Sequence, residues 1–76
     1  MNDPLAPVLW YLLGTKAVVH RDEICWWDPE RAEAILEAAG MTHLGGSMWR
    51  TGPKTEAFAR EVERHIGYQP ALEKIL

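Results

Sequence analysis

The segment "DPERAEAILEAAG", residues 28–40, constrains the fold more than any other part of the chain, because both of its ends are marked. Asp28 is a residue type favoured as an N-cap, and Pro29 suits the first position of a helix. The residues that follow are strong helix formers, and Gly40 favours a stop in the left-handed conformation. These signals predict a helix that begins at Pro29 and ends before Gly40.

Another helix is predicted near the N-terminus. Asp3-Pro4 resembles an N-cap followed by proline at the first helical position, and Ala6-Pro7 offers a later alternative start. Gly14 is the predicted end. This helix is expected to be buried on more than one side or to meet another molecule, because its apolar surface is broad. Its apolar residues are Leu5, Val8, Leu9 and Leu12 at helical spacing, with Trp10, Tyr11 and Leu13 beside them.

The longest predicted helix lies toward the C-terminus. The segment "PKTEAFAREVERHI" opens at Pro53 and is closed by Gly67. A further helical turn or two is predicted after Pro70 in "YQPALEKIL".

Two β-hairpins are predicted between these helices. The segment "KAVVHRDEICWW" is rich in β-branched and aromatic residues, and Arg21-Asp22 lies where the chain could reverse. The segment "MTHLGGSMWRTG" is typical of two short strands around a Gly45-Gly46 turn. The order helix, hairpin, helix, hairpin, helix predicts an α+β fold. We expect a compact single domain over residues 1–76, with a small antiparallel sheet of two hairpins packed against three helices.

Composition excludes several classes of protein. A 76-residue chain with one cysteine cannot build an internal disulfide framework, and its lone thiol fits a reducing cytoplasm. A hydrophobic share of 47% and a charged share of 25% are those of a folded domain. The net charge of -3 argues against a general nucleic-acid binder. The apolar run "LAPVLWYLLG" is too short to cross a bilayer and has no basic residue before it, so we expect a cytoplasmic protein and no membrane contact.

Two adjacent tryptophans precede the best-marked helix, in "EICWWDPE". On a strand, Trp26 and Trp27 would face opposite sides, so one would enter the core. Trp27 stands just before the N-cap, where an apolar side chain commonly packs on the fourth helical residue, here Ala32. The alternative is that Trp27 stays exposed as a binding anchor. The sequence leaves open which member of the pair is exposed.

A row of carboxylates follows the tryptophans. Glu30, Glu33 and Glu37 lie within a sector of about 60° on a helix, with Asp28 at its head. This row is either a solvated helix face or a ridge that docks on a basic surface and imitates the charges of nucleic acid. The predicted partner-binding surface consists of Trp27, Asp28, Glu30, Glu33 and Glu37, extended by Asp22 and Glu23.

Catalytic and metal chemistry find little support. Cys25 could pair with His20 or His43, but acidic neighbours disfavour a thiolate, and a small core residue is the simpler interpretation. The three histidines and the cysteine do not match a zinc spacing. We therefore predict no catalytic residue, no metal site and no cofactor.

Two other hypotheses compete with a protein-binding surface. A small DNA- or RNA-binding regulator could combine an aromatic ring with basic side chains, although glutamates interleave with them. A self-assembling structural subunit could use the apolar first helix. The residues of the regulator hypothesis are Trp49, Arg50, Lys54, Arg60 and Arg64.

By its length, its acidic helix "DPERAEAILEAAG" and its lack of a catalytic constellation, the chain resembles the small acidic proteins of bacteriophages and mobile elements, including anti-CRISPR inhibitors. The resemblance is one of general character and carries no residue-by-residue correspondence. It implies stoichiometric binding to a CRISPR surveillance complex that blocks access of target DNA. The predicted function is thus that of a small non-enzymatic protein-binding inhibitor.

Overall fold

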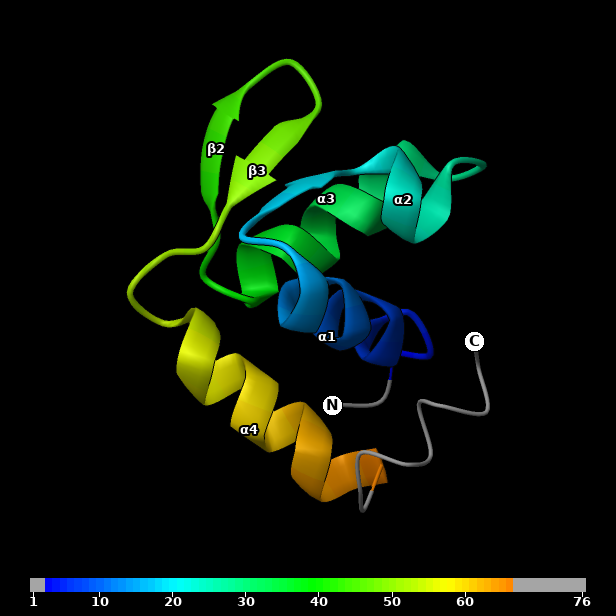
Figure 1. Cartoon of the computed structure of the whole chain (residues 1–76). Helices are drawn as coiled ribbons and strands as arrows, with labels where there is room; N and C mark the ends of the chain where they lie inside the picture. The colour runs from blue at the N-terminus through cyan, green and yellow to red at the C-terminus, as the bar shows by residue number, and fades with distance from the viewer. Residues whose placement is uncertain (1–2, 67–76) are drawn as a thin grey trace.

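Four helices and a three-stranded antiparallel sheet form the part of the chain that the computed structural model describes, residues 3–66 (Figure 1). The predicted α+β class is confirmed. In chain order the elements are α1 (Ala6–Thr15), β1 (Val18–His20), α2 (Asp22–Cys25), α3 (Pro29–Ala38), β2 (Thr42–Gly45), β3 (Met48–Arg50) and α4 (Thr55–Ile66).

The sheet has the order β1-β3-β2, so β3 is its central strand. The predicted hairpin around Gly45-Gly46 is confirmed as β2 and β3. The third strand, β1, pairs with β3 from a distant part of the chain, and Val19 lies opposite Trp49. His43 of β2 lies opposite the same tryptophan on its other side. Residues of three separate segments therefore meet across the middle of the sheet.

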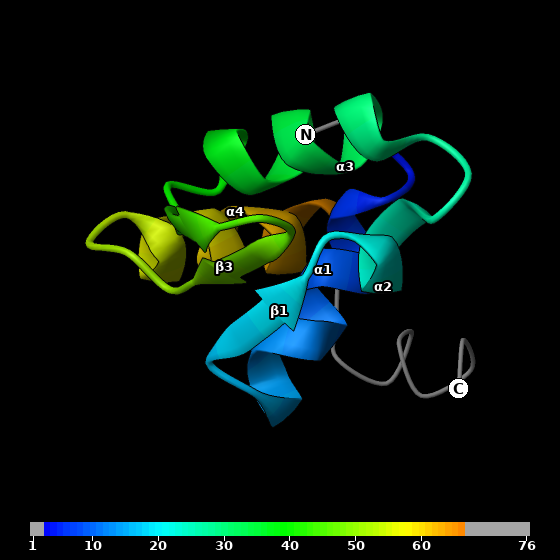
Figure 2. The ribbon, with the colours of Figure 1, turned by 90° about the horizontal axis from the view of Figure 1, so that it is seen from above.

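Within residues 3–66, helices cover one face of the sheet. Val19 and Trp49 point into the core, whereas their neighbours Val18, Met48 and Arg50 are exposed, as the alternation of side chains along strands requires. The helices α1 and α3 pack against each other, α1 lies beneath β1, and α4 packs against α1 (Figures 1 and 2). The core consists of Leu5, Ala6, Leu9, Val19, Ile24, Cys25, Ala32, Ile35, Leu36, Ala39, Met41, Trp49, Phe58 and Val62.

The predicted first hairpin is wrong in its second half, because the chain turns into the single-turn helix α2 where a second strand was expected. Ile24 and Cys25 are adjacent and both buried, which a strand with one covered face does not allow. Polar groups fix the start of this helix: the Asp22 N–H donates to His20 Nδ1 at 3.1 Å, and Glu23 Oε2 accepts from the His20 N–H at 3.3 Å. Early carboxylates also complement the positive end of a helix.

The helix α3 follows its prediction closely. Asp28 Oδ1 accepts a hydrogen bond from the Arg31 N–H at 3.2 Å, which is the expected N-cap contact. At the other end Gly40 has a φ of 71°, its N–H donates to the Glu37 carbonyl, and the Met41 N–H donates to the Leu36 carbonyl. This pair of bonds is a Schellman motif, in which glycine adopts the left-handed conformation at no steric cost.

The helix α1 begins at the later of its two predicted starts, Ala6. Asp3 still contributes, because its Oδ1 accepts from the Leu5 N–H at 2.9 Å in the turn before the helix. The predicted stop at Gly14 is wrong: the helix continues to Thr15, and the extended residue Lys16 ends it. Gly14 is thus an ordinary helical residue here.

The helix α4 begins two residues later than predicted. Pro53 belongs to a turn, in which Thr55 Oγ1 accepts from the Gly52 N–H at 2.8 Å. The predicted stop at Gly67 and the helical turn after Pro70 lie outside the described residues. Within residues 3–66, no helix is both long and apolar enough to cross a membrane.

Candidate functional site

Both tryptophans of the pair are exposed. Trp26 is 73% exposed and Trp27 is 61% exposed, so the expectation that one of them enters the core is wrong. Their rings meet edge to face, with centroids 5.6 Å apart and an angle of 83° between the planes. This is a favoured geometry for aromatic rings. The connection between α2 and α3 that carries them projects from the edge of the molecule in both views (Figures 1 and 2).

The tryptophan pair lies between two fixed points. On its N-terminal side, Ile24 and Cys25 are buried in the core. On its C-terminal side, Asp28 caps α3, and its N–H donates to the Cys25 carbonyl at 3.4 Å. Ala32, the expected packing partner of Trp27, is buried, yet most of the Trp27 ring remains exposed. The short, bonded connection therefore holds two large apolar rings in water.

The acidic row on α3 is divided. Glu30 and Glu37 are exposed, and neither pairs with a cation among the described residues. Glu33 is half-buried, and its Oε2 lies 3.2 Å from Arg21 Nη1. The middle of the row is thus neutralised by the protein itself, and its two ends remain charged.

Arg31, the one cation on α3, is turned away from this row. Its Nη2 lies 3.0 Å from Asp3 Oδ1 and its Nε lies 3.4 Å from Asp3 Oδ2. Burial by itself would raise the pKa of Asp3, but the hydrogen bond from the Leu5 N–H and the pairing with Arg31 lower it below its usual value. The same hydrogen bond raises the pKa of Arg31. Arg31 thus joins α3 to the start of α1 and leaves Glu30 unpaired.

Asp22 and Glu23 lie in the first turn of α2 and contact basic residues next to it. Glu23 forms an ion pair with Lys16, and Asp22 Oδ1 lies 3.7 Å from Arg21 Nε. Glu23 also accepts the His20 N–H. Of the two, Asp22 is the more available to a partner, because its side chain is half exposed.

Two of the other candidate residues, Trp49 and Cys25, lie in the core. Trp49 is 4% exposed, and its ring stacks on that of His43 with centroids 4.5 Å apart. Cys25 is fully buried. Among the described residues, no three His, Cys, Asp or Glu side chains gather as a metal site would require.

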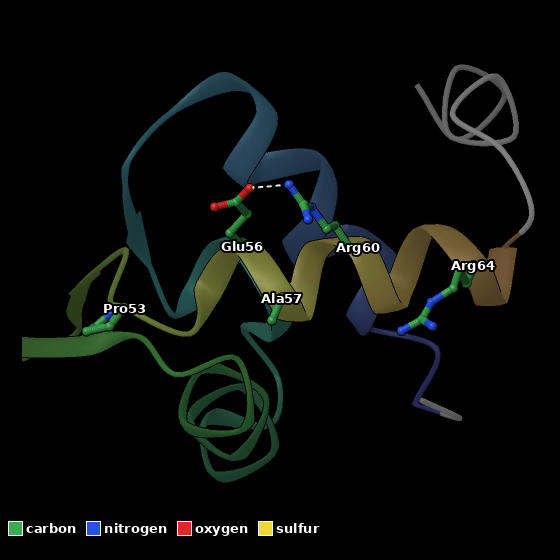
Figure 3. Close-up of a pocket in the computed structure, with 5 residues that line it drawn as sticks. All are labelled: Pro53, Glu56, Ala57, Arg60 and Arg64. Carbon is green, nitrogen blue, oxygen red and sulfur yellow. Dashed lines mark hydrogen bonds and ion pairs between the residues drawn. The ribbon is translucent and has the colours of Figure 1, made fainter.

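The basic residues of α4 line an open groove (Figure 3). Arg60 Nη2 lies 2.6 Å from Glu56 Oε1, in an ion pair that is itself largely exposed. Figure 3 shows Arg64 extending away from this pair. Because Glu56 already pairs with Arg60, the groove attracts an anion only weakly. The residues that line it are Pro53, Glu56, Ala57, Arg60 and Arg64.

Sequence reasoning missed two residues of this surface. Trp26 was expected on a strand and was not included in the predicted binding surface. Arg21 was expected only in a turn, whereas it forms an ion pair with Glu33 of α3. Ile24 and Cys25 are adjacent and apolar, and this pattern is compatible with a buried strand as well as with a helical turn, so the sequence held no clear signal for α2.

No protein-family model matches the chain, and searches of curated proteins and of solved structures gave no match either.

Proposed function

We propose that this protein is a small non-enzymatic inhibitor that binds another protein through the tryptophan pair and the adjoining acidic end of α3. The contact surface consists of Trp26, Trp27, Asp28, Glu30 and Glu37. The single observation that supports it most is the exposure of two adjacent tryptophan rings, 73% and 61%, on a connection fixed at both ends.

Burial of the exposed rings against a partner would contribute a large part of the free energy of binding. Covering roughly 100 Å² of apolar surface on each ring contributes about 2.5 kcal/mol, at ~25 cal/mol per Å². Tryptophan is enriched among the few residues that dominate protein interfaces. Two such rings held in place lose little entropy on binding, because the connection is already ordered.

The exposed face of α3 suits close docking beside the pair. Ala34 and Ala38 are exposed beside Glu30 and Glu37, so the face has small side chains next to two carboxylates. A partner with a shallow apolar patch and basic residues at its rim would complement such a face. Compared with the sequence-based hypothesis, the electrostatic share falls because Arg21 already pairs with Glu33, and the aromatic share rises.

The proposed partner is a CRISPR surveillance complex, as the resemblance to anti-CRISPR proteins implies. Such complexes guide nucleic acid along positively charged channels. An acidic, aromatic surface could occupy a basic channel and exclude DNA from it. The proposal requires no catalytic group and no cofactor.

The test is inhibition of target-DNA binding by a panel of purified CRISPR surveillance complexes, with direct binding measured in parallel. The protein is compared with Trp26→Ala/Trp27→Ala and with Glu30→Lys/Glu37→Lys. Loss of both rings should weaken binding by about 1,000-fold, since interface hot spots contribute ~2 kcal/mol or more each. Charge reversal should slow association most at low salt.

Two matched variants control for general effects. Leu44→Ala removes an apolar side chain that is 51% exposed on β2, and Glu61→Lys reverses an exposed charge on α4. Both should bind as the parent does. If no complex in the panel binds the protein, the anti-CRISPR partner is wrong. If binding survives loss of both rings, the surface is wrong.

The burial of Trp49 and the packing of α1 count against the two competing functions. Base stacking on Trp49 would require removing that ring from the core, because it is 4% exposed. Self-assembly through α1 would compete with packing of the same helix on α3 and α4. Measurable affinity for single-stranded DNA, falling steeply with salt, would favour the regulator. A mass that rises with concentration would favour the structural subunit.

A further inference from the structure

The tryptophan pair is flanked by carboxylates on both sides in the sequence. Residues 22–30 contain four of them and no Lys or Arg. The nearest cations, Arg21 and Arg31, are drawn away toward Glu33 and Asp3. The rings therefore stand in a negative field that the protein neutralises only in part.

We infer that the pair receives a basic side chain, arginine or lysine, from the partner protein. This inference rests on the proposed function and names the chemistry that the surface recognises. The face of an indole attracts a cation through its quadrupole, and tryptophan does so more strongly than the other aromatic residues. Two rings at 83° form a corner with faces in two directions, so a guanidinium or ammonium group in the corner contacts more than one ring.

The surrounding charge selects among possible occupants. Exposed tryptophans also stack on nucleic-acid bases, but the phosphates that accompany a base would be repelled by Asp28 and Glu30. An anionic lipid surface is disfavoured for the same reason. A cationic side chain alone is attracted both by the rings and by the carboxylates, which lie within three residues of Trp27.

The geometry fits arginine well. Its planar guanidinium stacks on an aromatic face while its N–H groups remain free to donate in the ring plane. Glu30 is exposed in the first turn of α3 and has no cation partner among the described residues, so it can accept from such a group. One side chain can thus satisfy both the rings and the carboxylate.

The experiment titrates the protein with a short capped peptide that carries arginines, followed by NMR of the four indole N–H signals. The matched probe replaces each arginine by citrulline, which keeps the shape and removes the charge. Conservative Trp26→Phe and Trp27→Phe variants assign two of the signals. The arginine peptide should shift these two signals and leave those of Trp10 and Trp49 unchanged.

Two further comparisons measure the contributions. Each exposed Trp→Ala change should weaken the arginine peptide by about two- to fivefold, and Trp→Phe should weaken it less. A third peptide, with lysine in place of each arginine, should bind more weakly than the arginine peptide, because an ammonium group has no planar face to stack on a ring. Equal binding of the citrulline peptide, or tighter binding of an oligothymidylate, would overturn the inference.

Failure of this inference differs from failure of the proposed function. If the tryptophans are needed for binding a surveillance complex but the arginine peptide shifts no signal, the inference falls and the function stands. If the arginine peptide binds at the pair and no complex does, the inference stands and the function falls.

Discussion

Arg21 Nη1 lies 3.2 Å from Glu33 Oε2, which joins the residue before α2 to the middle of α3. The pair closes the connection that carries the two exposed tryptophans, because Arg21 precedes it and Glu33 follows it. It also removes one charge from the acidic row. A single ion pair thus affects both the position of the rings and the charge beside them.

Arg21→Gln should have opposite effects on stability and on binding. The partly exposed ion pair contributes about 0.5–1 kcal/mol to the free energy of unfolding, which the variant loses. The freed Glu33 should in turn strengthen binding of an arginine peptide. Urea unfolding and the same peptide titration measure the two effects. Glu33→Gln is the matched variant, and a double-mutant cycle with no coupling energy would contradict the contact.

Gly52→Ala should destabilise the protein. A Cβ on Gly52 would overlap the carbonyl oxygen of Gly40, so the turn after α3 and the turn before α4 would have to separate. We expect a loss of roughly 1–3 kcal/mol in the free energy of unfolding, as overpacking usually costs. Gly14→Ala is the matched control: it meets no atom within 4 Å and lies in α1, so it should stabilise by up to about 1 kcal/mol. Equal effects of the two changes would contradict this packing.

Stability should fall with acid in a way that depends on Asp3. Its folded pKa lies below the ordinary value of 3.8, so its stabilising contribution is complete above that value and is lost as the pH falls through the folded pKa. Asp3→Asn should therefore lose stability at neutral pH and converge with the parent in acid. Urea unfolding at several pH values between about 2 and 6 tests this. Parallel curves for the two proteins would contradict it.

Cys25 should be protected from thiol reagents in the folded state. Its side chain is fully buried, so modification requires an opening of the structure and should accelerate greatly in urea. The control is Cys25→Ala/Ala34→Cys, in which the thiol stands at an exposed position of α3 and should react at once. Rapid modification of the parent under native conditions would argue against a core role for Cys25.

The elements that sequence predicted well are those whose signals are local. The bounds of α3 depend on Asp28 and Gly40, which act on their own neighbours in the chain. The β2–β3 hairpin depends on its Gly45-Gly46 turn in the same way. Pairing of β1 with β3 could not be predicted, because it joins residues about thirty positions apart and depends on the shared core of Val19 and Trp49.

The error at α2 has a specific cause. Ile24 and the tryptophans favour strands by propensity, but burial of Ile24 and Cys25 together stabilises one helical turn more than a strand would. The candidate site shows the same division. Asp28, Glu30 and Glu37 lie where the sequence placed them, whereas the pairing of Glu33 with Arg21 depends on how α2 packs on α3.

The tryptophan pair, its N-cap and the exposed face of α3 belong to one uninterrupted stretch of chain, residues 26–37. A recognition surface assembled from distant segments cannot be removed from its protein, but one that is contiguous can be grafted. The same residues placed at the start of a helix in an unrelated scaffold, with buried residues supplied before them, would carry the surface with them. Its geometry depends on the N-cap of a helix, and an N-cap is formed by hydrogen bonds between neighbouring residues of the same segment.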